Sequence, residues 1–311
     1  MTAACNPLAA EQADSAAAPV GAEHFAAFLA GIGHRVVRTE SAYWYDASWG
    51  FFLSMPSHHL LVPTAAELRS VLRRQPSLGV RFPAPLEGPG TLSYQIICDA
   101  PDYGLAQLSA NTRSKVRRGL RRCTVRPVSF AEIAASGVDA DRTTLSRQGR
   151  PPRLRGARWA RYWTAAAATP GMEGWGAFVG HHLAAFLVTV QFGEGVEFLL
   201  ARSRSDLLDA YPNNALIFSV AEELLGHRGV REITFGLESL EPVGPLDQFK
   251  FGMGFRPRPL RQRVVFHPAI RWAVQSPAVR ALLLRRGGRP GEAAMFWRKA
   301  AGLVRLAEGD R

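Results

Sequence analysis

Three consecutive runs, at residues 175–179, 183–191 and 196–201, are rich in apolar residues that favour strands, and this pattern predicts three β-strands. The turns between the runs are short and contain glycine, so neighbouring strands are expected to pair in antiparallel orientation. The sequence therefore predicts an antiparallel meander in the second half of the chain.

A helix that begins at Asn213 and Asn214 is predicted to follow the meander. Its apolar side comprises Leu216, Ile217, Val220, Ala221, Leu224 and Leu225. Residues 230–236 predict a strand, which a helical crossover should place parallel to the strand before it. A short helix over residues 245–254 and a last strand over 260–268 complete the predicted order: three strands, helix, strand, helix, strand.

The first third of the chain predicts a small α+β unit, because short apolar runs there alternate with proline, glycine and one helical segment. The first residues lack the basic and apolar regions of a signal peptide, and we interpret them as a disordered leader. The predicted division is a leader (1–22), an N-terminal α+β subdomain (23–102), a larger α+β domain (103–268) and basic amphipathic helices (269–311).

A strongly basic helix is predicted over residues 109–123, with Ser109 as its N-cap. Its expected buried stripe consists of Leu108, Thr112, Val116 and Leu120. Its basic rows are Arg113, Arg117 and Arg121 on one side and Lys115, Arg118 and Arg122 on another. No acidic residue occurs between Asp102 and Glu132, so either an anionic partner or plain solvation must offset the repulsion between these charges.

The composition describes a globular chain with a basic balance. The chain has 311 residues, 47% of them apolar, which is enough for one large domain or two closely joined ones. A net charge of +12 favours an anionic partner. The three cysteines have neither disulfide nor metal-ligand spacing, and no apolar run approaches the roughly 18 residues of a spanning helix. We expect a cytoplasmic protein.

A second basic stretch runs from Lys250 to Arg289 without an acidic residue and continues into amphipathic helical segments. The first interpretation of these segments is that they pack against the body of the protein. The same helices would suit an anionic membrane surface or RNA phosphates. The expected location is therefore the cytoplasm, with peripheral contact at the inner face of the membrane as the alternative.

With these residues in this order, the chain resembles the GCN5-related N-acyltransferase (GNAT) fold, and within it the FemAB-like and BioF2-like branch. The resemblance covers roughly residues 103–268. It rests on three pieces: the basic helix LSANTRSKVRRGLRR, the meander sequence WGAFVGHHLAAFLVTV, and YPNNALIFSVAEELLGHRGVREITFGLES followed by FKFGMGF.

The resemblance implies an acyl donor in a V-shaped opening between two diverging parallel strands, with acyl-CoA as co-substrate and no metal. Asn213, Asn214 and Ala215 begin a helix whose free N–H groups would face a pyrophosphate. Lys250 would reach a phosphate, or would simply pair with Asp247 on the same helix. The segment DAYPNNAL lacks the glycines usual in this loop of the family, so an aminoacyl-tRNA or an acyl carrier protein stays open as the donor.

Acyl transfer to an amine requires a base for the amine proton and hydrogen-bond donors for the developing oxyanion. Glu238, just past the end of a predicted strand, is the expected base, or else a solvent-facing acid in a loop. Ser239 is the candidate hydrogen-bond donor and Tyr211 the candidate acid for the leaving group, with a structural role as the alternative for each. The expected substrate-binding residues are Arg113, Arg117 and Gln148.

Two classes of function follow. The first is an N-acyltransferase that moves an acyl group, other than an aminoacyl group, from a thioester to a small-molecule or peptide amine by direct attack. Its alternative is an aminoacyl-tRNA-dependent peptidyltransferase of the FemAB kind. The second class is a non-catalytic basic module that binds RNA or anionic lipid.

Residues 144–156 predict a loop whose length is typical of a lid or a substrate loop.

Overall fold

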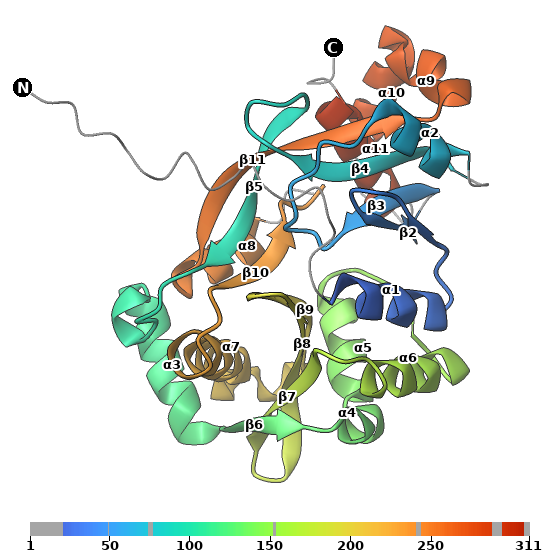
Figure 1. The fold of residues 1–311 in the computed structure, drawn as a ribbon. Helices are drawn as coiled ribbons and strands as arrows, with labels where there is room; N and C mark the ends of the chain where they lie inside the picture. The colour runs from blue at the N-terminus through green and yellow to red at the C-terminus, as the bar shows by residue number, and fades with distance from the viewer. Residues whose placement is uncertain are drawn as a thin grey trace, which may run out of the picture.

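The computed structural model describes residues 21–48, 50–73, 77–151, 154–240, 244–287 and 294–307. One mixed sheet of eleven strands runs through the molecule in the order β1-β2-β3-β4-β11-β5-β10-β9-β8-β7-β6. Helices cover both faces of this sheet (Figure 1). The predicted α+β class is confirmed. Residues 1–20 of the predicted leader lie outside the described residues, and its last residue, Ala22, already belongs to helix α1.

The strands are β1 (Val36–Arg38), β2 (Tyr43–Ser48), β3 (Phe51–Met55), β4 (Gly79–Ala84), β5 (Thr91–Cys98), β6 (Thr124–Val128), β7 (Met172–Val179), β8 (His182–Phe192), β9 (Gly195–Ser203), β10 (Glu232–Leu237) and β11 (Arg256–Phe266). The α-helices are α1 (Ala22–Gly31), α2 (Ala65–Leu72), α3 (Ala110–Arg122), α4 (Phe130–Ser136), α5 (Val138–Arg147), α6 (Ala157–Ala167), α7 (Pro212–Glu222), α8 (Gly244–Gly252), α9 (Pro268–Gln275), α10 (Pro277–Gly287) and α11 (Ala294–Leu306). None of the helices in the described ranges has the length and apolar character that a bilayer crossing requires.

The order of elements predicted for the second half of the chain is confirmed. Strands β7, β8 and β9 form an antiparallel meander, and α7 then leads to β10, which pairs with β9 in parallel. The six apolar residues predicted for α7 are buried, because this helix packs its whole length against the meander. Helix α8 and strand β11 follow in the expected sequence.

The N-terminal strands belong to the same sheet as the meander. Strand β5 lies between β10 and β11, and it pairs with both in antiparallel orientation. Strand β4 pairs with the other edge of β11. The boundary between an N-terminal subdomain and a larger domain near residue 102 stays a prediction, since hydrogen bonds of the sheet cross it.

The two faces of the meander carry different helices. Helices α3, α7 and α8 lie on one face, called here the α7 face, and α1, α4, α5 and α6 lie on the other, called here the α5 face (Figure 1). Each face has its own apolar core, because side chains along a strand alternate between the two sides. Helix α11 packs separately, near β11.

Two local predictions are wrong. Leu120 is 40% exposed, and Gly119 takes the buried position on α3. A four-residue spacing drifts by about 40° per step around a helix with 3.6 residues per turn, so the predicted stripe leaves the buried side. Thr144 to Arg147 are helical residues of α5, and the predicted loop starts only after them.

Candidate functional site

Strands β9 and β10 pair at their beginnings and then separate. Parallel pairing joins Glu232 to Gly195, Ile233 to Val196 and Thr234 to Glu197. Beyond these pairs, β9 continues to Ser203 without β10 as a neighbour, and β10 changes its register with β5. Pairing between the two parallel strands thus ends after Thr234 and Glu197, and we call this point of separation the fork.

Aromatic rings fill the α7 face at the base of the fork. The centroid of Phe235 on β10 lies 5.1 Å from that of Phe198 on β9 and 4.7 Å from that of Phe255. The Nζ atom of Lys250 lies 5.4 Å from the Phe235 centroid and donates a hydrogen bond of 3.0 Å to Asp247. Lys250 therefore makes the plain intrahelical pair, on the far side of these rings from the α5 face.

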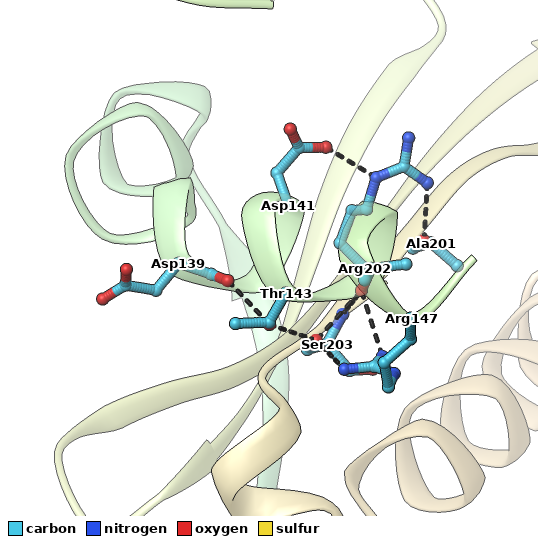
Figure 2. A network of polar contacts seen from close by, with 8 residues as sticks. Asp139, Asp141, Thr143, Arg147, Ala201, Arg202 and Ser203 are labelled. Atoms are coloured by element: carbon cyan, nitrogen blue, oxygen red, sulfur yellow. Dashed lines mark hydrogen bonds and ion pairs between the residues drawn. The ribbon is translucent and has the colours of Figure 1, made fainter. Parts of the chain in front are cut away.

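Helix α5 occupies the open edge of β9 beyond the fork (Figure 2). The backbone N–H of Ser203 donates to the Thr144 hydroxyl over 2.8 Å, and the same hydroxyl donates to the Ser203 carbonyl over 2.9 Å. Arg147 adds bonds of 3.1 Å to this carbonyl and 2.9 Å to the Ser203 hydroxyl. One threonine thus provides the donor and the acceptor that a neighbouring strand would provide.

The start of α7 is strained and positively polarised. Tyr211 immediately before the helix has φ of 58°, the one positive value among the described residues other than glycine. No side chain caps the helix, so its first N–H groups point outward, and Arg118 of α3 lies over the Tyr211 ring at 5.1 Å. Gly119 permits this contact between helices, since a Cβ there would lie 2.8 Å from the Tyr211 carbonyl oxygen.

The residues predicted to bind the cofactor have structural partners at this helix start. The Asn213 amide donates to the Ser203 hydroxyl over 2.9 Å, and the Asn214 amide contacts the Met253 sulfur at 3.6 Å. Ala215 is fully buried against α3. What these residues still offer a ligand is the backbone N–H groups of the first helical turn.

Glu197 is the carboxylate nearest to the fork, on the α5 face. Its position in β9 is the last one paired with β10, and Ser57 donates a hydrogen bond of 2.9 Å to its carboxylate. Burial raises the pKa of Glu197 above its ordinary value, although the Ser57 hydrogen bonds oppose the shift. Burial, together with the charge of Glu197, raises the pKa of Tyr45 to about 12. A basic carboxylate and a protonated phenol are therefore neighbours.

Glu238, the predicted base, follows β10 and is held by neighbours on β5 and β4. The Ser93 hydroxyl donates a hydrogen bond of 2.6 Å to the Glu238 carboxylate, and Arg81 donates one of 2.9 Å to the Glu238 backbone carbonyl. Burial lowers the pKa of Arg81 to about 10, so the guanidinium stays charged at neutral pH. Arg81 interacts electrostatically with both Tyr45 and Glu238, which links Glu238 to the Glu197 cluster. Ser239 is exposed.

The residues predicted to bind substrate separate into two groups. Arg113 and Arg117 line a depression on α3, whose lining comprises Ala110, Arg113, Ser114, Arg117, Arg118 and Arg121. Arg113 also donates to the Leu108 carbonyl over 3.1 Å. Gln148 is exposed at the C-terminal end of α5, on the other face of the sheet, so the structure does not bring it to the two arginines.

Sequence reasoning missed Glu197, Ser57 and Tyr45. The available signal was an acid inside the otherwise apolar run VEFLLA, because an ionisable side chain in a buried strand needs a partner or a function. Its partner Ser57 is 140 positions away in the chain. Strand alternation alone does not identify such a partner.

The fold is similar to three solved structures over most of their length. FemX shares 12% identity with a TM-score of 0.56, over 80% of this chain and 92% of that one. The C-terminal domain of a putative lysylphosphatidylglycerol synthetase from Agrobacterium fabrum shares 11% (TM-score 0.54, 80% and 88%). L-PGS from Bacillus licheniformis shares 14% (TM-score 0.53, 89% and 100%).

No family model and no curated protein matches the sequence. Similarity to solved structures at such low identity establishes the fold, which is GNAT-like with a mixed sheet and flanking helices.

Proposed function

We propose that the protein transfers an acyl group to an amine, with Glu197 as the general base. The observation that carries this proposal is the half-buried Glu197 carboxylate at the point where β9 and β10 separate. The amine nitrogen attacks the acyl carbonyl carbon, a C–N bond forms, and the bond from that carbon to the donor breaks. The amine proton passes to Glu197 and then to the departing donor atom.

Two neighbours of Glu197 have properties suited to this step. The Tyr45 hydroxyl keeps its proton at neutral pH, because its pKa is raised to about 12, and it can donate to the developing oxyanion. Ser57 orients the Glu197 carboxylate through its 2.9 Å hydrogen bond. Glu238 is the second candidate base, on the same side of the sheet, and Tyr211 stays a predicted acid at the start of α7.

We further propose that the donor is an aminoacyl-tRNA. A pantetheine arm would need the open edge of β9, and Thr144 already hydrogen-bonds both backbone groups of Ser203 there. Helix α3 instead presents an arginine-lined depression beside the strained start of α7, which suits the phosphates of a nucleic acid. One of the similar structures is the C-terminal domain of a putative lysylphosphatidylglycerol synthetase, and lysylphosphatidylglycerol is an aminoacylated lipid.

Acyl-CoA is the second candidate donor. The observation that favours it is the uncapped start of α7, whose free N–H groups and positive dipole end lie beside Arg118 and suit a pyrophosphate. In this case the acyl arm would reach the fork past Phe198 and Phe235. The acceptor in both cases is a small-molecule or peptide amine.

The two donors are distinguished by one experiment. The protein is incubated with a set of amines and either tRNAs charged with radiolabelled amino acids or acetyl-CoA. Movement of label from tRNA to an amine supports the first donor, and release of free CoA with acylation of an amine supports the second. Salt-sensitive RNA binding with no transfer from either donor would contradict the enzyme proposal and favour a basic binding module.

A further inference from the structure

A small charged pocket lies at the far end of β9, away from the base of the fork. It has a volume of about 180 Å³ and is lined by Asp141, Leu145, Arg150, Pro151, Leu154, Arg202 and Lys299. These residues come from α5, the segment that follows it, β9 and α11. No residue of the cluster around Glu197 lines this pocket, so it is a separate feature of the molecule.

The charges of the lining residues favour an anion. Three cationic side chains, those of Arg150, Arg202 and Lys299, face one carboxylate, that of Asp141. Asp141 is 5% exposed, and its carboxylate accepts a hydrogen bond of 2.6 Å from Arg202 Nε (Figure 2). Because Arg202 neutralises this acid, the pocket keeps an excess of positive charge.

Arg150 is the lining cation with the least structural role. Its side chain is half-buried and makes no hydrogen bond or ion pair within the described ranges. Arg202, in contrast, also donates a hydrogen bond of 3.0 Å to the Ala201 carbonyl. The apolar walls Leu145 and Leu154 lower the local polarity, and an ionic hydrogen bond is stronger there than in open solvent.

Because β9 contains a bulge, the side chains of Arg202, in this pocket, and of Glu197 point to the same side of the sheet. The register with β8 shifts between the pairs Val188–Leu200 and Thr189–Phe198, which inserts one extra residue in β9. Arg202 consequently faces α5, on the side toward which Glu197 also points. Arg202 lies five positions after Glu197, a span of about 15 Å.

We infer that this pocket binds an anionic group of the acceptor, a carboxylate or a phosphate, while the acceptor amine lies at Glu197. The inference rests on the proposed function, because it specifies the acceptor of the same site. It defines the acceptor as an extended molecule whose amine and anion lie about 15 Å apart along β9. Arg150, Arg202 and Lys299 act here as binding residues, at a distance from the reacting atoms.

The test measures anion binding without turnover. Inorganic phosphate and succinate are titrated separately into the full-length protein, and the dissociation constant of each is determined by calorimetry. We expect one or both to bind, and Arg150→Ala to raise the dissociation constant about tenfold or more. Arg150→Lys should restore part of the affinity. Arg158→Ala, which removes an exposed arginine of α6, is the matched control and should bind as the native protein does.

The outcomes separate the alternatives. Tighter binding of phosphate identifies a phosphate group on the acceptor, and tighter binding of succinate identifies a carboxylate. Equal affinities in the native protein and Arg150→Ala, or no binding of either anion, would overturn the inference. Glu197→Gln should bind the anion normally, so pocket binding that depends on Arg150 without any transfer would reject only the proposed function. Transfer without such binding would reject only the pocket.

Discussion

At the scale of single residues, Glu197 is the side chain on which the proposed chemistry depends. We expect Glu197→Gln to lower kcat by about 100-fold or more with little change in donor affinity, because the amide cannot take the amine proton. Steady-state kinetics and a binding titration check this. Glu194→Gln, at an exposed acid just before β9, is the control. Unchanged turnover would remove Glu197 from the mechanism and return the role to Glu238.

The same residue sets the expected pH profile. Only the deprotonated carboxylate accepts a proton, and burial raises the pKa of Glu197, so kcat/KM should fall as the pH drops through that raised pKa. The acid limb should lie above the ordinary range of a glutamate and should be absent from the residual rate of Glu197→Gln.

His58 should make the folding free energy depend on pH. Burial lowers the pKa of His58 to about 4, and its Nδ1 atom is buried without a hydrogen-bond partner among the described residues. Histidine in an unfolded chain has a pKa of about 6.5, so between about pH 6.5 and 4 the unfolded state binds a proton at His58 that the folded state does not bind. The free energy of unfolding should therefore decline as the pH falls from about 6.5 to 4, by up to roughly 3 kcal/mol. Urea unfolding at several pH values measures this.

The control for this prediction is His58→Gln, which removes the titrating group. It should flatten the dependence of the unfolding free energy in that window, and an identical slope in the variant and the native protein would contradict the assignment.

Single residues were the least predictable level of the site. The lysine at 250 could be predicted to pair with Asp247, because both lie on one short helix, and the structure has that pair. The role of Glu197 could not, because its partners Ser57 and Tyr45 come from the loop after β3 and from β2. Local spacing identifies partners within one element, whereas buried polar clusters depend on which elements meet.

At the scale of elements, the contact between α5 and β9 should contribute measurably to stability. Thr144→Val keeps the shape of the side chain but leaves the buried N–H of Ser203 without its acceptor. We expect a loss of about 1–3 kcal/mol in the free energy of unfolding, measured by urea denaturation. Thr164→Val, at an exposed position of α6, is the matched control and should change stability by less than about 0.5 kcal/mol.

Most elements could be predicted and some of their ends could not. The meander follows from apolar runs of strand-forming residues between short turns with glycine, and α7 follows from apolar residues at helical spacing. Thr144, Ser146 and Arg147 are polar or basic, and the helical state of this segment depends on contacts of Thr144 and Arg147 with Ser203 that the sequence does not reveal. Leu120 is exposed for a related reason, because the close approach of α7 selects Gly119 as the buried position.

At the scale of the whole molecule, the net charge of +12 should favour the binding of tRNA, mainly through the arginines of α3. The double variant Arg117→Gln/Arg121→Gln should weaken tRNA binding and reduce its salt slope by about 2, since each removed phosphate contact lowers the slope by roughly one. Filter binding at several salt concentrations checks this. The control Arg69→Gln/Arg73→Gln removes the same charge from α2 and its C-cap, and it should leave the slope nearly unchanged.

Strand β11 separates β4 from β5, which are neighbours in sequence. As the chain leaves the ribosome, these two strands emerge before the strand that joins them, which follows more than 150 positions later. Until then their facing edges stay unpaired, and unpaired edges recruit other chains. Synthesis of this protein therefore includes a long interval in which a nascent chain needs protection from its neighbours, and the sheet closes only after β11 has emerged.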